Sequence, residues 1–263
     1  MELNTDNKKI DQLFADFFGL DSNYIHQCYR KLKDSYNLKL SSSHEGFIPK
    51  QKKSWRIQLQ EKTQNHWENS TLIGVDLPLF FKCPDPKAQT VMLVAQDPLR
   101  HRNDFPNFKF KDGDVIIGTP FAQHSSKYRE GLQKVVFSSI KNIIDNNYNV
   151  YITDVYKVWV EQKEYNPPYK LFKKNEPIIF GELLLNELDI IKPKNIICLG
   201  KVAEEFFSDT PILKNYNLSK RNLYLPHPGG QNTKTWKKCL INQKQSPENK
   251  IKYLKTKIDE YLD

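Results

Sequence analysis

The chain has 263 residues, of which 38% are hydrophobic, so it can bury a core and is not intrinsically disordered. Its net charge of +9 favours a polyanionic partner. The four cysteines include no C-x-x-C pair and no apolar run reaches about 18 residues, which excludes zinc-ribbon, iron–sulfur and membrane-spanning architectures. We therefore expect a reduced, cytoplasmic, monomeric protein without a metal, a cofactor or a membrane partner.

Positive charge is concentrated toward the carboxyl terminus. Residues 214–263 contain 11 Lys or Arg but only 4 Asp or Glu. A solvated basic helix and tail would give this pattern, and so would a surface that binds nucleic acid.

Helices are expected at the start of the chain. Apolar residues recur at three- and four-residue spacing in KKIDQLFADFF and YIHQCYRKLKDSY, within residues 8–40. Residues 41–70 are polar and include SSSHEG, which indicates a loop. We assign residues 1–70 to an N-terminal helical extension, packed on an α/β body formed by residues 71–263.

The body is expected to contain four short strands, each nearly continuous in apolar residues. This is the pattern of strands buried on both faces of a parallel sheet. The strands are VMLVA (91–95), NVYIT (149–153), NIICL (195–199) and NLYLP (222–226). Helical patterns lie in residues 128–147, 176–192, 201–207 and 248–262. The alternation predicts a three-layer α/β/α sandwich around a central four-stranded parallel sheet.

Polar residues stand at the ends of these strands. Gln96 and Asp97 follow the first strand, Asp154 follows the second, and His227 follows the fourth. Ligands of open parallel sheets bind at the carboxyl ends of the strands, so these residues are expected in one crevice. An Asp in this position is often only a helix cap, and His-Pro is often only a turn.

Five stretches resemble motifs of the uracil-DNA glycosylase superfamily. LVAQDPLRH (93–101) is similar to the family's first motif, a strand that ends in Gly-Gln-Asp-Pro-Tyr-His. YLPHPGG (224–230) is similar to the second catalytic motif, His-Pro-Ser. Three other segments are similar to the stacking-Phe segment, the base-reading strand and a structural strand with its helix start: GTPF (118–121), VYITDVYKV (150–158) and IICLGKVA (196–203). The resemblance covers residues 90–240 and leaves out the first 70.

The resemblance implies a DNA glycosylase, which flips a base out of DNA and hydrolyses its N-glycosidic bond to leave an abasic site. Asp97 would orient the attacking water and stabilise the sugar cation, and His227 would donate a hydrogen bond to the base. Gln96 would lie at the pocket floor, Phe121 would stack on the base, and Asp154 would read the base edge. The reaction passes through an oxocarbenium-like sugar and a departing anion, which suits an acid and a donor on opposite sides. A paired base must first leave the stack.

The resemblance also implies residues that contact single- or double-stranded DNA. The segment from Gly229 to Trp236 would enter the minor groove, and lysines beside it would bind phosphates. The expected DNA-binding residues are Arg100, His101, Gly229, Gly230, Gln231, Asn232, Lys234, Trp236 and Lys237.

Two base-pocket residues depart from the family pattern. Leu99 replaces a Tyr that crowds C5 of the base, and Asp154 replaces an Asn that matches uracil. A protonated Asp would accept a hydrogen bond from N4 of cytosine and donate one to N3. The two changes favour a cytosine-type base modified at C5, in DNA repair or antiviral defence. A misalignment by one residue would leave a uracil-DNA glycosylase of base excision repair as the alternative.

Two other classes share the expected fold. A non-catalytic DNA-binding module would not need the Gln-Asp-Pro acid or the His-Pro motif. A nucleotide-binding Rossmann enzyme would carry a G-x-G-x-x-G or a P-loop after a strand, and the chain has neither. The retained motifs therefore favour the glycosylase.

Overall fold

The computed structural model describes residues 1–37, 70–96, 116–131, 133–162, 176–210, 213, 222–229 and 233–263. The centre of the main sheet consists of four parallel neighbours, in the order β6 (Asn149–Asp154), β4 (Thr90–Ala95), β8 (Asn195–Leu199) and β9 (Asn222–Leu225). These are the four strands expected from the sequence, and their ends differ from the prediction by one residue at most.

In the described part of the chain the main sheet has six strands, in the order β1-β3-β6-β4-β8-β9. β3 (Leu79–Lys82) pairs antiparallel with β6, and β1 (Glu2–Asn4) pairs antiparallel with β3. Neither strand was expected from the sequence, because three or four residues are too few to show a period. The N-terminal segment thus supplies a strand of the sheet as well as helices.

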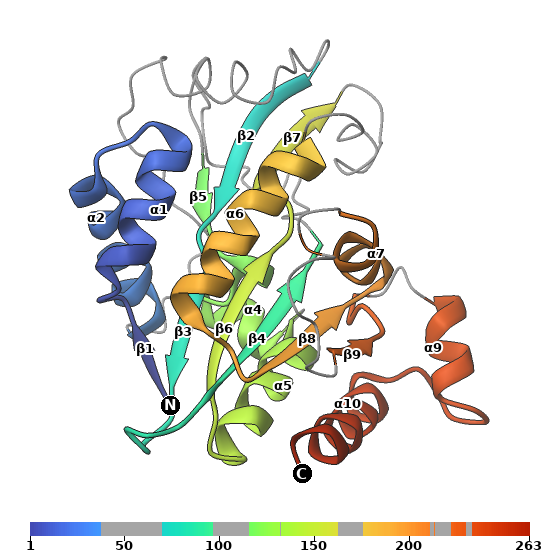
Figure 1. The fold of residues 1–263 in the computed structure, drawn as a ribbon. Coiled ribbons are helices and arrows are strands. Elements are labelled where there is room, and N and C mark those ends of the chain that lie inside the picture. The colour runs from blue at the N-terminus through green and yellow to red at the C-terminus, as the bar shows by residue number, and fades with distance from the viewer. Residues whose placement is uncertain are drawn as a thin grey trace.

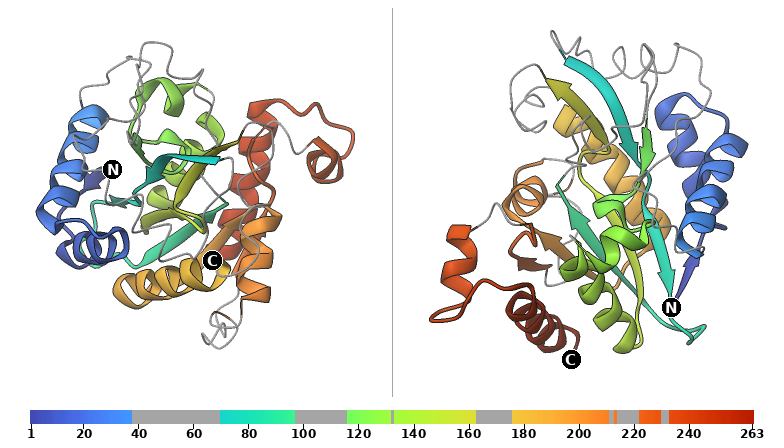
Figure 2. Two further views of the ribbon diagram at one scale, coloured as in Figure 1. Left: turned by 90° about the horizontal axis from the view of Figure 1, so that it is seen from above. Right: turned by 180° about the vertical axis from the view of Figure 1, so that it is seen from behind.

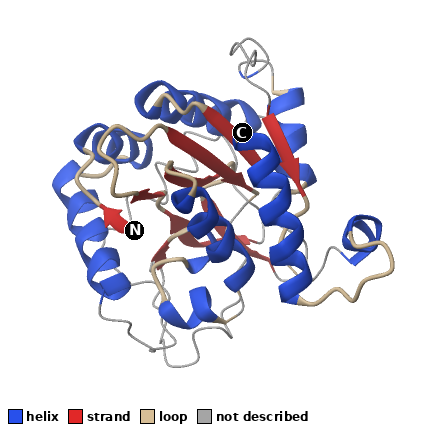
Figure 3. Ribbon diagram, turned by 90° about the horizontal axis from the view of Figure 1, so that it is seen from below, coloured by secondary structure: helices blue, strands red, loops and turns tan. Residues whose placement is uncertain are grey.

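Helices cover both faces of the sheet, which gives the expected three layers (Figures 1 and 3). One face packs on α1 (Lys8–Phe18), α2 (Ser22–Asn37), α6 (Glu176–Ile191) and α7 (Lys201–Asp209). The other face packs on α5 (Lys134–Asp145) and α10 (Pro247–Leu262). Met92 and Val94 of β4 belong to the first core, whereas Val91 and Leu93 belong to the second. Alternate side chains enter opposite apolar cores, which explains the continuous apolar runs.

Local signals set several helix ends. The side chain of Asn7 accepts a hydrogen bond from the amide of Ile10 at the start of α1, and Gly19 ends that helix in the left-handed conformation. Ser246 caps α10 in the same way, with Pro247 at the first helical position. Caps of this kind explain why the two N-terminal helices separate where they do.

A second sheet extends from the carboxyl edge of the parallel strands. Its order is β5-β2-β7, and its strands are β5 (Ile116–Gly118), β2 (Ser70–Asp76) and β7 (Val158–Gln162). β7 begins four residues after β6 ends, and the amide of Asp76 donates to the carbonyl of Lys157 at 2.9 Å. The chain leaves β5 directly into the short 3₁₀ turn η2 (Pro120–Ala122) and helix α4 (Ser126–Glu130). The second sheet therefore sets the place of Phe121.

The remaining described helix, α9 (Thr233–Cys239), lies near α10 and carries part of the basic carboxyl-terminal region (Figure 2). No helix in the described ranges combines the length and the apolarity that crossing a membrane requires.

Candidate active site

The carboxyl edge of the parallel strands carries most of the described candidate residues. Asp154 ends β6 opposite Ala95 of β4, Gln96 follows β4, and His227 follows β9. Gln96 is half-buried, and its carbonyl accepts a hydrogen bond from the amide of Tyr156 at 3.0 Å. Asp97 lies outside the described residues, so its position opposite His227 stays a prediction.

The imidazole of His227 is held in one tautomer. The amide of Gly229 donates to its Nδ1 at 3.1 Å. Because Nδ1 accepts this bond, the proton of the neutral ring sits on Nε2, which is then the free donor of the ring. The carbonyl of His227 accepts a hydrogen bond from the indole Nε1 of Trp236 at 3.0 Å, which fixes the backbone. The residue is thus prepared to donate from Nε2.

The surroundings keep His227 neutral. Burial and, to a smaller extent, the positive charge of Lys250 together lower its pKa to about 4. The side chain of Lys250 is itself buried, with its ammonium 5.0 Å from the centre of the Trp236 ring. A neutral imidazole near pH 7 can stabilise a developing anion by a hydrogen bond without giving up its proton.

Two glycines leave room for this ring. A Cβ on Gly229 would stand 2.9 Å from Nδ1 of His227, and a Cβ on Gly200 would stand 2.9 Å from the Cβ of His227. Gly200 also has a φ of 97°, which disfavours any other residue. From the sequence, Gly229 was expected only as a DNA contact, because its hydrogen bond to His227 exists only in the folded turn.

Phe121 lies beside His227, with ring centres 5.5 Å apart and ring planes at 39°. Phe121 and Ala122 both have positive φ, 53° and 50°, which is uncommon for residues with side chains. Backbone hydrogen bonds hold this turn, among them Ala122 to the carbonyl of Thr119 at 2.8 Å. Strained backbone of this kind gathers at functional sites. Nothing in the local sequence revealed it.

Asp154 is 2% exposed and is held from two sides. The amide of Val155 donates to the carbonyl of Ala95 at 2.9 Å, and Lys157 Nζ donates to the carbonyl of Asp154. Lys157 is fully buried and forms an ion pair with Glu187 of α6, with Nζ 2.7 Å from Oε2. The sequence analysis missed this pair because its members are 30 positions apart and come together only in the fold.

The same network reaches back along β6. Tyr151 and Thr153 donate from their hydroxyl groups to Glu187 Oε1 at 2.8 and 2.7 Å. The Thr153 hydroxyl accepts from Lys157 Nζ at 2.7 Å. The turn that carries Asp154 is therefore anchored through buried, charged hydrogen bonds to helix α6.

The described DNA-binding candidates divide into two kinds. Lys234 and Lys237 are exposed on α9, as a phosphate contact requires. Trp236 differs from the expectation, because it is 0% exposed and packs edge-on against Tyr253 of α10. Its indole supports His227 from inside the core, so its side chain is not available to enter DNA. The base-pocket candidate Leu99 lies outside the described residues, and so do five DNA-binding candidates: Arg100, His101, Gly230, Gln231 and Asn232.

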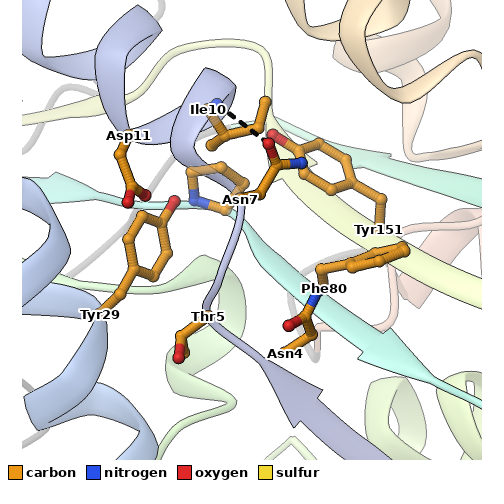
Figure 4. A pocket seen from close by; sticks show the side chains of 9 residues that line it. Asn4, Thr5, Asn7, Ile10, Asp11, Tyr29, Phe80 and Tyr151 are labelled. Atoms are coloured by element: carbon orange, nitrogen blue, oxygen red, sulfur yellow. Dashed lines mark hydrogen bonds between the residues drawn. The ribbon is translucent and has the colours of Figure 1, made fainter.

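A small pocket of about 20 Å³ lies elsewhere, between the N-terminal segment and the sheet (Figure 4). Asp11 of α1, Tyr29 of α2 and Tyr151 of β6 line it. No residue of the candidate site lines this pocket, and Tyr151 stands in the middle of β6 rather than at its carboxyl end.

Within the described ranges, no group of three His, Cys, Asp or Glu side chains could hold a metal ion. A search of curated proteins finds no match to the chain.

A family model does match. The model of the uracil DNA glycosylase superfamily covers residues 81–255, which is more than half of the chain. The matched range contains the strand ends with Gln96, Asp154 and His227, and the strained turn with Phe121. Membership in this superfamily indicates a DNA glycosylase in general terms. This match, together with the fold and the residues at the carboxyl edge of the sheet, shows that the chain belongs to the uracil DNA glycosylase superfamily.

Proposed function

We propose that this protein stacks an everted base on Phe121, donates a hydrogen bond to it from His227, reads its edge with Asp154, and hydrolyses its N-glycosidic bond. The observation that carries the proposal is the state of His227. Its Nδ1 accepts from Gly229, its ring is neutral near pH 7, and it lies 5.5 Å from the Phe121 ring. A stacking ring beside a fixed neutral donor suits a flipped pyrimidine.

The reaction breaks the bond between C1′ of the sugar and the ring nitrogen of the base, and the bonding electrons leave with the base. His227 donates a hydrogen bond from Nε2 to the carbonyl oxygen on which the negative charge gathers. In the proposal Asp97 stabilises the positive sugar and orients a water, whose oxygen bonds to C1′. One proton of that water is released, and the base anion takes up a proton after it departs.

Asp154 is the residue that we propose selects the base. Asp154 is 2% exposed, and burial by itself disfavours a charged carboxylate. A neutral carboxyl can accept from N4 of cytosine and donate to N3, whereas an ionised one cannot donate. With Leu99 in place of a bulkier aromatic residue, we propose a cytosine-type base modified at C5 as substrate, in repair or antiviral defence.

The test is a panel of oligonucleotides, single- and double-stranded, that carry uracil, cytosine or C5-substituted cytosines. Alkaline heating after incubation reveals abasic sites as strand breaks. We expect breaks at substituted cytosines, and we expect Asp154→Asn to move the preference toward uracil. Release of uracil alone by the unmodified protein would exclude the cytosine proposal and leave a repair uracil-DNA glycosylase.

Catalysis is separated from binding by Asp97→Asn. We expect this variant to bind the preferred oligonucleotide and to make no abasic sites. Full activity in Asp97→Asn would remove Asp97 from the mechanism. Tight binding by the unmodified protein with no breaks on any oligonucleotide would support the non-catalytic DNA-binding module instead.

A further inference from the structure

Arg129 is a buried guanidinium that joins the Phe121 turn to the N-terminal helices. It is 5% exposed. Its Nη1 donates to the carbonyl of Gln123 at 2.8 Å, and its Nη2 donates to the carbonyl of Tyr36 at 3.2 Å. Its Cζ lies 4.1 Å from the centre of the Tyr36 ring, a close cation–π contact.

The charged group of Arg129 contacts α2. Among the ion pairs of the described residues, none includes Arg129, although burial lowers its pKa and so opposes the charge. Tyr36 of α2 offers the guanidinium both a carbonyl oxygen and the face of its ring. The ring of Tyr36 is held in turn by Phe81 of β3, with ring centres 5.8 Å apart.

The other end of Arg129 reaches the stacking residue. Gln123 is 0% exposed, and its side-chain Nε2 donates to the carbonyl of Phe121 at 3.3 Å. The contacts therefore run from Tyr36 through Arg129 and Gln123 to Phe121. Left-handed conformations at Phe121 and Ala122 persist only where the surroundings hold them.

Tyr36 lies outside residues 81–255, so the superfamily match does not account for it. We propose that the N-terminal segment acts as a positioning element for base recognition, in which Tyr36 holds Arg129 and Arg129 holds the turn that aims Phe121 at the base. The inference rests on the proposed function, because it assigns Phe121 the stacking role. Arg129 and Tyr36 are positioning residues and do not touch the substrate.

The first measurement needs no glycosylase activity. The full-length chain is labelled with 4-fluorophenylalanine at position 121, whose ring lies next to the His227 ring. We expect Arg129→Gln and Tyr36→Leu to shift or broaden the ¹⁹F resonance, since the turn loses its anchor. Tyr36→Phe keeps the ring and the backbone carbonyl, so it is the matched control and should leave the resonance unchanged. An unchanged resonance in Arg129→Gln would overturn the proposal.

The second measurement is a double-mutant cycle on the single-turnover rate of base release. We expect Arg129→Gln to lower this rate about 10- to 100-fold, because small displacements of positioning groups cost that much. On a Phe121→Ala background the same change should cost less than about twofold, since the two residues act through one path. Equal losses on both backgrounds would show an effect on stability alone and contradict the proposal.

A second variant, Arg129→Lys, separates a loss of positioning from a failure to fold. Arg129→Lys keeps a positive charge but cannot reach both carbonyls, and it replaces Arg129→Gln if the latter does not fold. It should show the same pattern at a smaller amplitude. If the unmodified protein releases no base from any oligonucleotide, the proposed function fails, while the ¹⁹F measurement still decides whether Arg129 holds Phe121.

Discussion

His227 shows how single residues set the chemistry of the site. One amide fixes its tautomer, two glycines give it room, and burial with a nearby ammonium keeps it uncharged. Each contribution depends on a different neighbour, so each can be removed without replacing the imidazole itself.

Removing the charge of Lys250 should raise the pKa of His227. The folded-state pKa of about 4 lies below the usual value because burial and the ammonium both disfavour the imidazolium. In Lys250→Met only burial remains, so the ring should take up a proton at a higher pH. Imidazole ¹⁵N shifts followed through a pH titration measure this. Lys255→Met, an exposed change on the same helix, is the control and should not move the pKa. A lower pKa in Lys250→Met would contradict the account.

The lowered pKa of His227 also makes the stability of the fold depend on pH in the acid range. Unfolded His227 takes up a proton near pH 6.5, whereas the folded residue stays neutral down to about pH 4. Its contribution to stability is therefore present above the unfolded pKa and is lost as pH falls between these two values.

Gly229→Ala should impair catalysis more than folding. The added Cβ would stand 2.9 Å from Nδ1 of His227, so the imidazole must move and lose its fixed donor direction. We expect base release to slow by about tenfold or more, because a donor displaced from its place stabilises the departing anion poorly. Single-turnover kinetics measure the loss. Gly181→Ala is matched to it, since its Cβ would meet the Thr210 methyl at 2.8 Å and no atom of His227. A rate loss as large in Gly181→Ala would remove the specific explanation.

At the scale of elements, the turns after β5 and β6 carry more of the site than the strands themselves. The turn after β5 is held by Arg129, and the turn after β6 is held by Lys157 with Glu187. Both anchors are buried cations that donate to backbone carbonyls. Removing one member of such a buried group leaves its partner buried and unpaired, which lowers the free energy of unfolding.

Breaking the Lys157–Glu187 pair should therefore destabilise the fold strongly. Both side chains are 0% exposed, and we expect Lys157→Met to lower the free energy of unfolding by about 3–5 kcal/mol, because an unpaired carboxylate stays buried. Lys157→Met combined with Glu187→Gln should recover part of the loss. Urea unfolding measures both. Lys257→Met breaks an exposed pair with Glu260 and should have little effect. Additive losses in the double variant would contradict a coupled pair.

At the scale of the molecule, charge is arranged around the carboxyl edge of the sheet. Exposed Lys234 and Lys237 lie on α9, within the region that follows His227. Lys82, also exposed, ends β3, which runs antiparallel to β6 and so points to the opposite edge. A DNA strand bound at the site would contact Lys234 and Lys237 but not Lys82.

The salt dependence of DNA binding tests this arrangement. We expect Lys234→Ala and Lys237→Ala each to weaken binding and to reduce the slope of log K against log salt by about 1, since each would remove one of the expected phosphate contacts. Fluorescence anisotropy at several salt concentrations measures the slope. Lys82→Ala should leave it unchanged. An equal fall of the slope in all three variants would indicate a diffuse effect of net charge.

The sequence by itself determined the parallel core and the strand ends that carry Gln96, Asp154 and His227. Continuous apolar runs fix which strands are buried on both faces, and the polar residues that follow them must fall at one edge. The motifs also identified the superfamily, because Gln-Asp-Pro and His-Pro are short and local. Strands β1 and β3 were missed because they are too short to show a pattern.

Only the tertiary structure decided how these residues are held. The positive φ of Phe121, the buried position of Trp236 and the contacts of Arg129 and Lys157 join residues that are distant along the chain. A buried charge or a strained turn is stable only when particular neighbours surround it, and no local pattern records which neighbours those are.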